Sequence, residues 1–316
     1  MEKRALGTSG IKVNPIAFGG NVFGWTIDEK QSFKLLDAFV DGGLDLIDTA
    51  DVYSAWVPGN KGGESETIIG NWLKKSGKRN KVVIATKVGK PMGPGKSGLS
   101  KNYITKAVEE SLKRLQTDHI DLYQSHDDDK GTPLTETLAT YTELIKQGKI
   151  RAIGASNYGA DRLKQALEIS NVEGLAAYQC LQPEYNLYDR QGYEIELEGT
   201  CKLYDLGVIT YFSLASGFLT GKYRSVADLS KSQRGQGVKK YLDDRGYRIL
   251  NALDEVAAKY KTTPASVALA WVIARPGITA PIVSATSTDQ LKSIFDAPRL
   301  NLDNVAIELL NRASSY

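Results

Sequence analysis

Short apolar runs alternate with longer amphipathic segments from one end of the chain to the other. The runs are rich in Val and Ile and almost continuously apolar, which is typical of strands buried on both faces of a parallel sheet. Eight runs are predicted as strands: Ile16 to Gly20, Leu44 to Thr49, Val82 to Lys87, Ile120 to His126, Ile150 to Ser156, Leu175 to Cys180, Gly207 to Phe212 and Pro281 to Ala285.

The segments between these runs carry apolar residues three and four positions apart, which predicts helices. Examples are Lys30 to Val40, Ser65 to Lys74, Tyr103 to Arg114, Thr135 to Lys146 and Pro264 to Ala274. Thr263 before Pro264 is typical of an N-cap followed by proline in the first helical turn. Because parallel strands need a crossover of about a dozen residues or more, eight such units predict a closed (β/α)8 TIM barrel in the α/β class.

We find no Pro- or Ser-rich linker that would divide the chain, so residues 1–316 are predicted to form a single domain. Barrels of about 250 residues or more commonly form one unit. Tyr223 to Asp244 is polar, basic and Gly-containing, and it falls between the seventh and eighth predicted strands. This stretch is predicted as a loop, and both a mobile cover over a ligand and a surface excursion remain open.

The composition, 41% hydrophobic and 24% charged residues, is that of a globular protein. Basic and acidic residues number 40 and 37 and are spread along the chain, which argues against a nucleic-acid partner. No apolar run approaches the roughly 20 residues of a membrane helix, and the first residues do not resemble a signal peptide, so we expect a cytoplasmic protein without a membrane partner. Cys180 and Cys201 are expected to be buried free thiols.

Polar residues follow the predicted strands at the end of the barrel where active sites form. Asp48, Lys87 and His126 end the second, third and fourth strands, and Tyr53 lies in the loop after Asp48. A tyrosine has a pKa of about 10 and is a weak acid unless a cation stabilises its phenolate. Lys87 is predicted to lower the pKa of Tyr53, with Asp48 holding the lysine charged and His126 either orienting a substrate oxygen or sharing in proton relay. This set predicts general acid catalysis at a carbonyl oxygen.

Several motifs in family order resemble the aldo-keto reductases, most closely their bacterial branch. They are IDTADVY (Ile47 to Tyr53), IATK (Ile84 to Lys87), IDLYQSH (Ile120 to His126), GKIRAIGASN (Gly148 to Asn157), LQPEYNLYDR (Leu181 to Arg190), SLASGFLTGKYR (Ser213 to Arg224) and IVSATSTDQL (Ile282 to Leu291). The resemblance implies direct hydride transfer between NAD(P)H and an aldehyde or ketone. It also implies that Asp48, Tyr53, Lys87 and His126 form the catalytic tetrad, with Tyr53 as proton donor.

The same resemblance implies a set of cofactor-binding residues. Ser156, Asn157 and Gln182 would bond the nicotinamide carboxamide, and Tyr211 would stack on the ring. Small residues after the seventh strand would let backbone N–H groups approach the pyrophosphate, with Lys222 as an added counter-charge. The whole implied set is Gly20, Ser156, Asn157, Gln182, Tyr211, Ser213, Leu214, Gly217, Gly221, Lys222, Ser284, Ser287 and Gln290.

Cofactor choice depends on the loop after the eighth strand, where many family members place Lys and Arg against the 2'-phosphate of NADP. Ser284 and Gln290 occupy the matching positions here and carry no charge. Ser287 and Thr288 still offer hydroxyls at the start of an expected helix, and a helix N-terminus attracts phosphate. A strict NAD site would place a carboxylate against the ribose, and Asp289 is equally explained as a capping residue. We expect NADP(H) to be preferred, with NAD(H) possible.

Two other patterns suggest rival functions. GPGKSG (Gly93 to Gly98) matches the G-x-G-x-x-G spacing, but several residues separate it from the neighbouring strand and helix, so a flexible loop is the better interpretation. HDDD (His126 to Asp129), with Asp48 and Asp51, suggests a carboxylate-bound metal hydrolase. The chain has only two histidines, and His119 begins a strand at the opposite end of the barrel from His126, so no metal is predicted. The hydrolase and a non-catalytic, nicotinamide-binding regulatory subunit remain alternatives.

Substrate contacts are predicted at Trp25, Trp56 and the Tyr223 to Asp244 stretch, although both tryptophans also suit plain packing. Aromatic walls favour small carbonyl compounds with some apolar surface. The resemblance implies a monomer or weak homo-oligomer.

Overall fold

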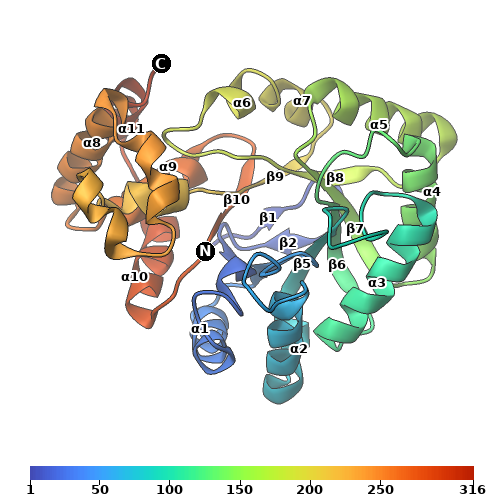
Figure 1. Cartoon of the computed structure of the whole chain (residues 1–316). Coiled ribbons are helices and arrows are strands. Elements are labelled where there is room, and N and C mark those ends of the chain that lie inside the picture. The colour runs from blue at the N-terminus through green and yellow to red at the C-terminus, as the bar shows by residue number, and fades with distance from the viewer.

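A closed barrel of eight parallel strands forms the centre of the computed structural model, which describes residues 1–316 (Figure 1). The strands follow one another around the barrel in chain order, and the last pairs with the first. They are β3 (Ala17–Gly19), β4 (Leu46–Asp48), β5 (Val83–Val88), β6 (Ile120–Ser125), β7 (Ile150–Ser156), β8 (Tyr178–Gln182), β9 (Gly207–Thr210) and β10 (Ile278–Val283). The predicted fold class is confirmed.

Helices surround this barrel (Figure 1). Several begin at a Ser, Thr or Asp whose side chain accepts a hydrogen bond from the backbone N–H three residues on, and the predicted N-cap Thr263 is among them. The helices are α1 (Glu29–Asp41), α2 (Glu64–Ser76), α3 (Lys101–Leu115), α4 (Leu134–Lys146), α5 (Ala160–Glu173), α6 (Gln191–Glu194), α7 (Glu198–Leu203), α8 (Asp244–Tyr260), α9 (Pro264–Ala274), α10 (Thr288–Asp296) and α11 (Asn304–Ala313).

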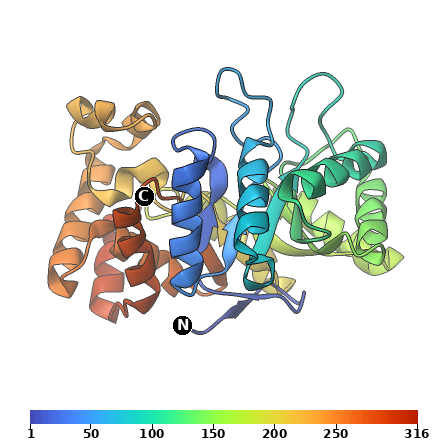
Figure 2. The ribbon, with the colours of Figure 1, turned by 90° about the horizontal axis from the view of Figure 1, so that it is seen from below.

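A short N-terminal hairpin closes one end of the barrel. Its strands, β1 (Arg4–Ala5) and β2 (Lys12–Val13), are antiparallel and do not appear among the predicted strands. Leu6, Ile11 and Val13 are buried in the same apolar cluster as the side chains inside the barrel. Figure 2 shows the hairpin at one end and long loops projecting from the other, so the loop-bearing end is left for a site.

Two predicted strands are shifted in the structure. The predicted run Leu175 to Cys180 begins too early, because its first residues follow the helix-ending Gly174 and are only partly buried at the edge of the main apolar core, and β8 begins at Tyr178. Gln182 is therefore the last residue of β8. The predicted run Pro281 to Ala285 extends too far, since β10 starts at Ile278 and ends at Val283.

The 223–244 segment is not the irregular loop that its composition suggests. It holds two 3-10 helices, η4 (Val226–Lys231) and η5 (Gly235–Tyr241). Leu229, Val238 and Tyr241 are buried, so apolar packing anchors the segment to the protein and it is not a plain surface excursion.

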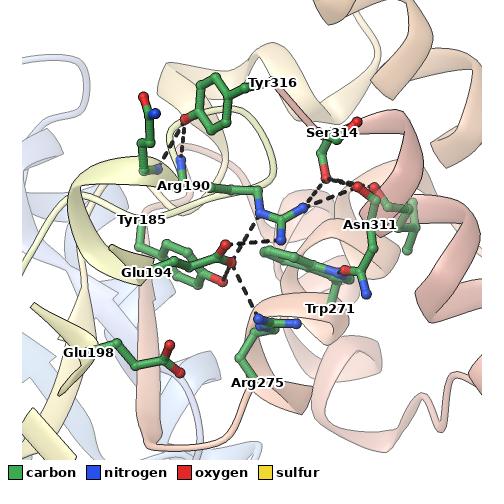
Figure 3. Close-up of polar contacts among 12 residues, drawn as sticks. Tyr185, Arg190, Glu194, Glu198, Trp271, Arg275, Asn311, Ser314 and Tyr316 are labelled. Carbon is green, nitrogen blue, oxygen red and sulfur yellow. Dashed lines mark hydrogen bonds and ion pairs between the residues drawn. The ribbon is translucent and has the colours of Figure 1, made fainter. Parts of the chain in front are cut away.

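An ion-pair network joins the chain after β8 to the C-terminus (Figure 3). Arg190 donates to both carboxylate oxygens of Glu194, at 3.0 Å each, and to the hydroxyl of Ser314 at 2.7 Å. Arg275 pairs with the same glutamate, and the hydroxyl of Tyr316 accepts from the backbone N–H of Arg190. The network fixes the loop that follows Gln182.

Cys180 and Cys201 are both buried and free, as predicted. None of the helices is both long enough and apolar enough to cross a membrane.

Candidate active site

An ion pair withdrawn from water lies at the carboxyl ends of β4 and β5. The ammonium of Lys87 donates to Asp48 Oδ2 at 2.6 Å, to the backbone oxygen of Thr49 at 2.8 Å and to the hydroxyl of Tyr53 at 3.1 Å. The side chains of Lys87 and Asp48 are 0% and 1% exposed. All three ammonium protons are therefore used, and one of them points at the tyrosine oxygen.

Two glutamines hold the other oxygen of Asp48. Gln182 donates to Asp48 Oδ1 at 2.9 Å and to Gln124 Oε1 at 3.0 Å, and Gln124 donates to Asp48 Oδ1 at 3.3 Å. The sequence analysis did not identify Gln124, because every residue of β6 is buried and no alternation shows which side chains point inward. These contacts fix the position of the Asp48 carboxylate. They also use both N–H groups of the Gln182 amide, so its nitrogen has no hydrogen left to donate to a ligand.

Burial raises the pKa of Tyr53 above its usual value, although the charge of Lys87 acts to lower it. The predicted effect of the lysine, which lowers the pKa of Tyr53, is present, but desolvation of the phenolate is the larger effect, so the net shift of the pKa is upward. Burial acts to lower the pKa of Lys87, but Asp48 and Tyr53 outweigh it and the pKa of the lysine is raised. At neutral pH the lysine is charged and the tyrosine holds its proton.

His126 follows β6 directly, and its ring lies edge-on to Tyr53 with centroids 5.9 Å apart. Burial, helped by the charges of Lys87 and Lys90, holds the pKa of His126 well below its usual value, so the imidazole is neutral at neutral pH. The other histidine, His119, immediately precedes β6 and is therefore at the opposite end of the barrel, as predicted.

A cavity of about 860 Å³ opens beside this cluster. Asp48, Tyr53 and His126 lie on its wall, whereas Lys87 is behind the wall and contacts two of the wall residues, Asp48 and Tyr53. Ten of the implied cofactor residues also line it: Ser156, Asn157, Gln182, Tyr211, Ser213, Leu214, Gly217, Lys222, Ser284 and Gln290.

Asn157 is at the centre of a hydrogen-bond network on one side of the cavity. Its amide donates to the backbone oxygen of His126 at 2.8 Å and to Ser156 Oγ at 3.2 Å, and its carbonyl accepts from the hydroxyl of Tyr211 at 2.9 Å. The backbone of Asn157 is left-handed, with φ of 58°. The network orders a flat ring and amide groups on one wall, which suits a planar heterocycle bearing a carboxamide.

The chain after β9 has an unusual backbone. Phe212, Ala215 and Ser216 have φ of 51°, 47° and 57°, and Gly217 has φ of 96°. Left-handed turns of this kind turn backbone N–H groups toward a common point, and such concavities bind anions. Lys222 lies beside them on the cavity wall. The residues present therefore fit a dinucleotide, with its ring near Asn157 and its phosphates near this loop.

Comparison with known proteins identifies the family of the chain. A model described as the Aldo/keto reductase family matches residues 15–314. The chain belongs to that family. It is 35% identical to a Bacillus subtilis protein named uncharacterized oxidoreductase YrpG, over 98% of this chain and 95% of the relative. The aldo-keto reductase YhdN of the same organism is 33% identical over 94% and 88%. A probable voltage-gated potassium channel subunit beta of Oryza sativa is 32% identical over 92% and 89%. The chain is thus an oxidoreductase of a family that works on carbonyl groups with nicotinamide cofactors.

Four residues assigned to ligands from the sequence lie outside the cavity wall of this aldo/keto reductase. Gly20 is a packing residue, since a Cβ there would come within 2.9 Å of Ser65 Oγ. Gly221 caps η3 (Ala215–Thr220) in a left-handed conformation, and Ser287 is the N-cap residue of α10. Trp25 packs edge-on against Trp56, which does line the cavity.

The region predicted to hold the 2'-phosphate is rich in hydroxyls. Ser284 Oγ is 2.7 Å from both Gly19 O and Asn21 Oδ1, and Gln290 Oε1 accepts from the backbone N–H of Thr286 at 2.8 Å. Thr286, which the sequence analysis did not select, lines the cavity in place of Ser287.

The metal alternative needs a ligand cluster, and the structure contains no group of three or more His, Cys, Asp and Glu side chains that could hold an ion. In the HDDD run, Asp128 pairs with Arg162 at 2.9 Å. Asp129 accepts from Leu99 N at 2.7 Å and from Thr132 Oγ1 at 2.7 Å. These two carboxylates hold neighbouring loops together.

The sequence analysis predicted that the 223–244 segment contacts the substrate without naming which of its residues do so, and it missed the cavity residue that follows β5. Ser232, Gln233 and Arg234 reach the cavity from the 223–244 segment, and Lys90 does so from the loop after β5. Composition indicated that the segment is polar and basic, but only its folded path shows which side chains face inward.

Proposed function

We propose that this aldo/keto reductase reduces aldehydes or ketones to alcohols with a reduced nicotinamide dinucleotide, and that Tyr53 is the general acid. The observation that carries the proposal is the hydrogen bond from Lys87 to Tyr53, because a hydroxyl that accepts from an ammonium has its own proton free for another acceptor. That proton is available on the cavity side, where Tyr53 forms part of the wall.

Each member of the tetrad has a distinct electrostatic task in this mechanism. Burial keeps Tyr53 protonated until the carbonyl oxygen gains negative charge. Lys87 then stabilises the phenolate that remains, and Asp48 keeps the lysine charged in a dry site. His126, neutral at neutral pH, is able to donate a hydrogen bond to the same carbonyl oxygen without competing for the proton of Tyr53.

A bound nicotinamide supplies the hydride that the carbonyl carbon accepts. Ser156, Asn157 and Tyr211 would hold its ring and carboxamide against one wall. Gln182 would contribute its carbonyl oxygen, because its nitrogen is committed to Asp48. The left-handed backbone at 215–217, with Lys222, would hold the pyrophosphate.

The relatives named as probable potassium channel subunits favour a second candidate, a nicotinamide-binding regulatory subunit. Such a role needs cofactor binding and has no need of a proton donor. The buried Lys87–Asp48 pair, costly to maintain without a task, favours catalysis over this candidate.

Steady-state oxidation of NADPH with a panel of small aldehydes and ketones tests the proposal. We expect turnover that is unchanged by EDTA, since the mechanism uses no metal. Binding of NADPH without turnover on any member of the panel would favour the regulatory subunit. A protein that neither binds nor oxidises NADPH would favour the hydrolase, which needs a metal and no nicotinamide.

We expect NADPH to be preferred over NADH by about tenfold in kcat/KM, because hydroxyls and a helix N-terminus bind phosphate more weakly than a guanidinium does. The 2'-phosphate would lie near Thr286, Ser284 and the start of α10. Steady-state kinetics with one good aldehyde measure the ratio, and Thr286→Arg should raise it. A ratio of one or less for the native protein would contradict the prediction.

A further inference from the structure

The cavity wall carries positive charge that the tetrad does not use. Lys90, Lys222 and Arg234 all line the cavity. Asp48 is the only carboxylate on the wall, and the buried ammonium of Lys87 neutralises it. Lys222 lies beside Gly217, where the cofactor phosphates are expected. Lys90 and Arg234 come from other segments, and this leaves two cations for another ligand.

Arg234 lacks a partner of its own. Its Nη2 is buried without a hydrogen-bond partner, and no carboxylate pairs with its guanidinium. Burial lowers the pKa of its guanidinium, while Tyr223 and Tyr53 oppose this effect. A buried cation whose N–H groups lack hydrogen-bond partners costs folding free energy unless an anion pairs with it, so the position of Arg234 indicates a binding site for an anionic group.

Stacked and edge-on rings fix the position of this guanidinium. The central carbon of the guanidinium lies 5.1 Å from the centroid of the Trp25 ring. The rings of Trp25 and Trp56 are edge-on with centroids 5.5 Å apart, and those of Trp56 and Tyr53 are edge-on with centroids 6.0 Å apart. Arg234 is therefore held at the end of the cavity that contains the proton donor. Trp25, which lies outside the wall, acts here as the support for Arg234.

Lys90 belongs to the same end of the cavity. It follows β5, forms no ion pair, and its charge contributes to the low pKa of His126. The two unpaired cations thus accompany the two groups, Tyr53 and His126, that would contact a carbonyl oxygen.

We propose that the substrate carries a carboxylate in addition to its aldehyde or ketone group, and that Arg234, assisted by Lys90, binds this carboxylate. The planar fork of a guanidinium matches the two oxygens of a carboxylate, and Trp56 offers an apolar face to the carbon skeleton between the two groups. The inference rests on the proposed function. The carbonyl carbon gains hydride, its oxygen gains the proton of Tyr53, and the carboxylate is unchanged.

The test compares 4-carboxybenzaldehyde with its methyl ester, which differs in charge at the same ring position. We expect the native protein to prefer the carboxylate at least about tenfold in kcat/KM, the value of one charge-assisted hydrogen bond. Arg234→Gln should remove that preference by lowering turnover of the carboxylate, with turnover of the ester and the Kd for NADPH nearly unchanged. Lys239→Gln, a charge loss on an exposed residue of η5 away from the cavity wall, is the matched control and should keep the preference.

Three results would overturn the inference while leaving carbonyl reduction intact. One is equal or better use of the ester by the native protein. Another is an equal loss on both substrates in Arg234→Gln together with weaker NADPH binding, which would assign Arg234 to the cofactor. The third is better use of glyceraldehyde 3-phosphate than of any carboxylated aldehyde, which would replace carboxylate by phosphate.

Calorimetry separates this inference from the proposed function. Binding of 4-carboxybenzyl alcohol to the protein saturated with NADPH, a pair that cannot react with each other, requires no turnover. Binding that Arg234→Gln abolishes supports the carboxylate site even if no aldehyde is reduced, and absence of binding to the native protein overturns it.

Discussion

Replacing Tyr53 with phenylalanine is expected to lower kcat for carbonyl reduction by at least about 100-fold, because positioned general acids contribute on that scale. Only the hydroxyl that accepts from Lys87 is removed. The phenyl ring keeps its contacts with Trp56 and His126, so the shape of the cavity is retained. The Kd for NADPH, measured by fluorescence titration, should be nearly unchanged, and the loss should appear in single-turnover kinetics as slow chemistry.

Tyr247→Phe provides the control for removal of a tyrosine hydroxyl. Tyr247 is exposed on α8, far in sequence from the tetrad and absent from the cavity wall, and its substitution should leave kcat as it is. A Tyr53→Phe protein that keeps more than half of the native activity would contradict the assignment of the acid. A large rise in the Kd for NADPH would instead make Tyr53 a binding residue.

The fold and the position of the tetrad were predictable because they depend on short-range patterns. Near-continuous apolar runs separated by helical periodicity specify parallel strands, and parallel strands place the residues that follow them at one end. Asp48, Lys87 and His126 could be grouped in this way without knowledge of distances. The N-terminal hairpin could not be predicted in this way, because strands of two residues are too short to show a periodic pattern of apolar residues.

Other features depend on tertiary structure that no local pattern specifies. Gln124 points inward to Asp48 from a strand that is buried along its whole length, so its burial pattern does not show the direction of its side chains. Arg234 reaches the cavity because Leu229, Val238 and Tyr241 anchor the segment that carries it. The net pKa of Tyr53 depends on the depth of burial, whereas the sequence reveals only the neighbouring charge. For Arg234 and Tyr53 the sequence shows the type of charged or ionisable group, but it does not show how deeply that group is buried.

Replacing Lys87 with methionine is expected to lower kcat by about 100-fold, the usual loss when one preorganised charge or donor at the reacting oxygen is removed. The same change should move the alkaline limb of the pH–rate profile for reduction to higher pH. Reduction needs protonated Tyr53 and fails as the pH rises through its pKa, and Lys87 acts to lower that pKa. Without the lysine the pKa of Tyr53 rises further, so the protonated form persists to higher pH. Alcohol oxidation, which needs the phenolate, should then begin only at higher pH.

Lys87→Met also leaves Asp48 buried without its counter-ion, and unpaired buried charges cost about 3–5 kcal/mol of stability. The double variant Asp48→Asn with Lys87→Met removes that penalty, because an amide can still contact Gln182 and Gln124. We expect the double variant to recover most of the free energy of unfolding, measured by urea denaturation, and none of the lost rate. If its alkaline limb coincides with that of the native protein, Lys87 does not act on the proton of Tyr53, and the lysine is a structural partner of Asp48 alone.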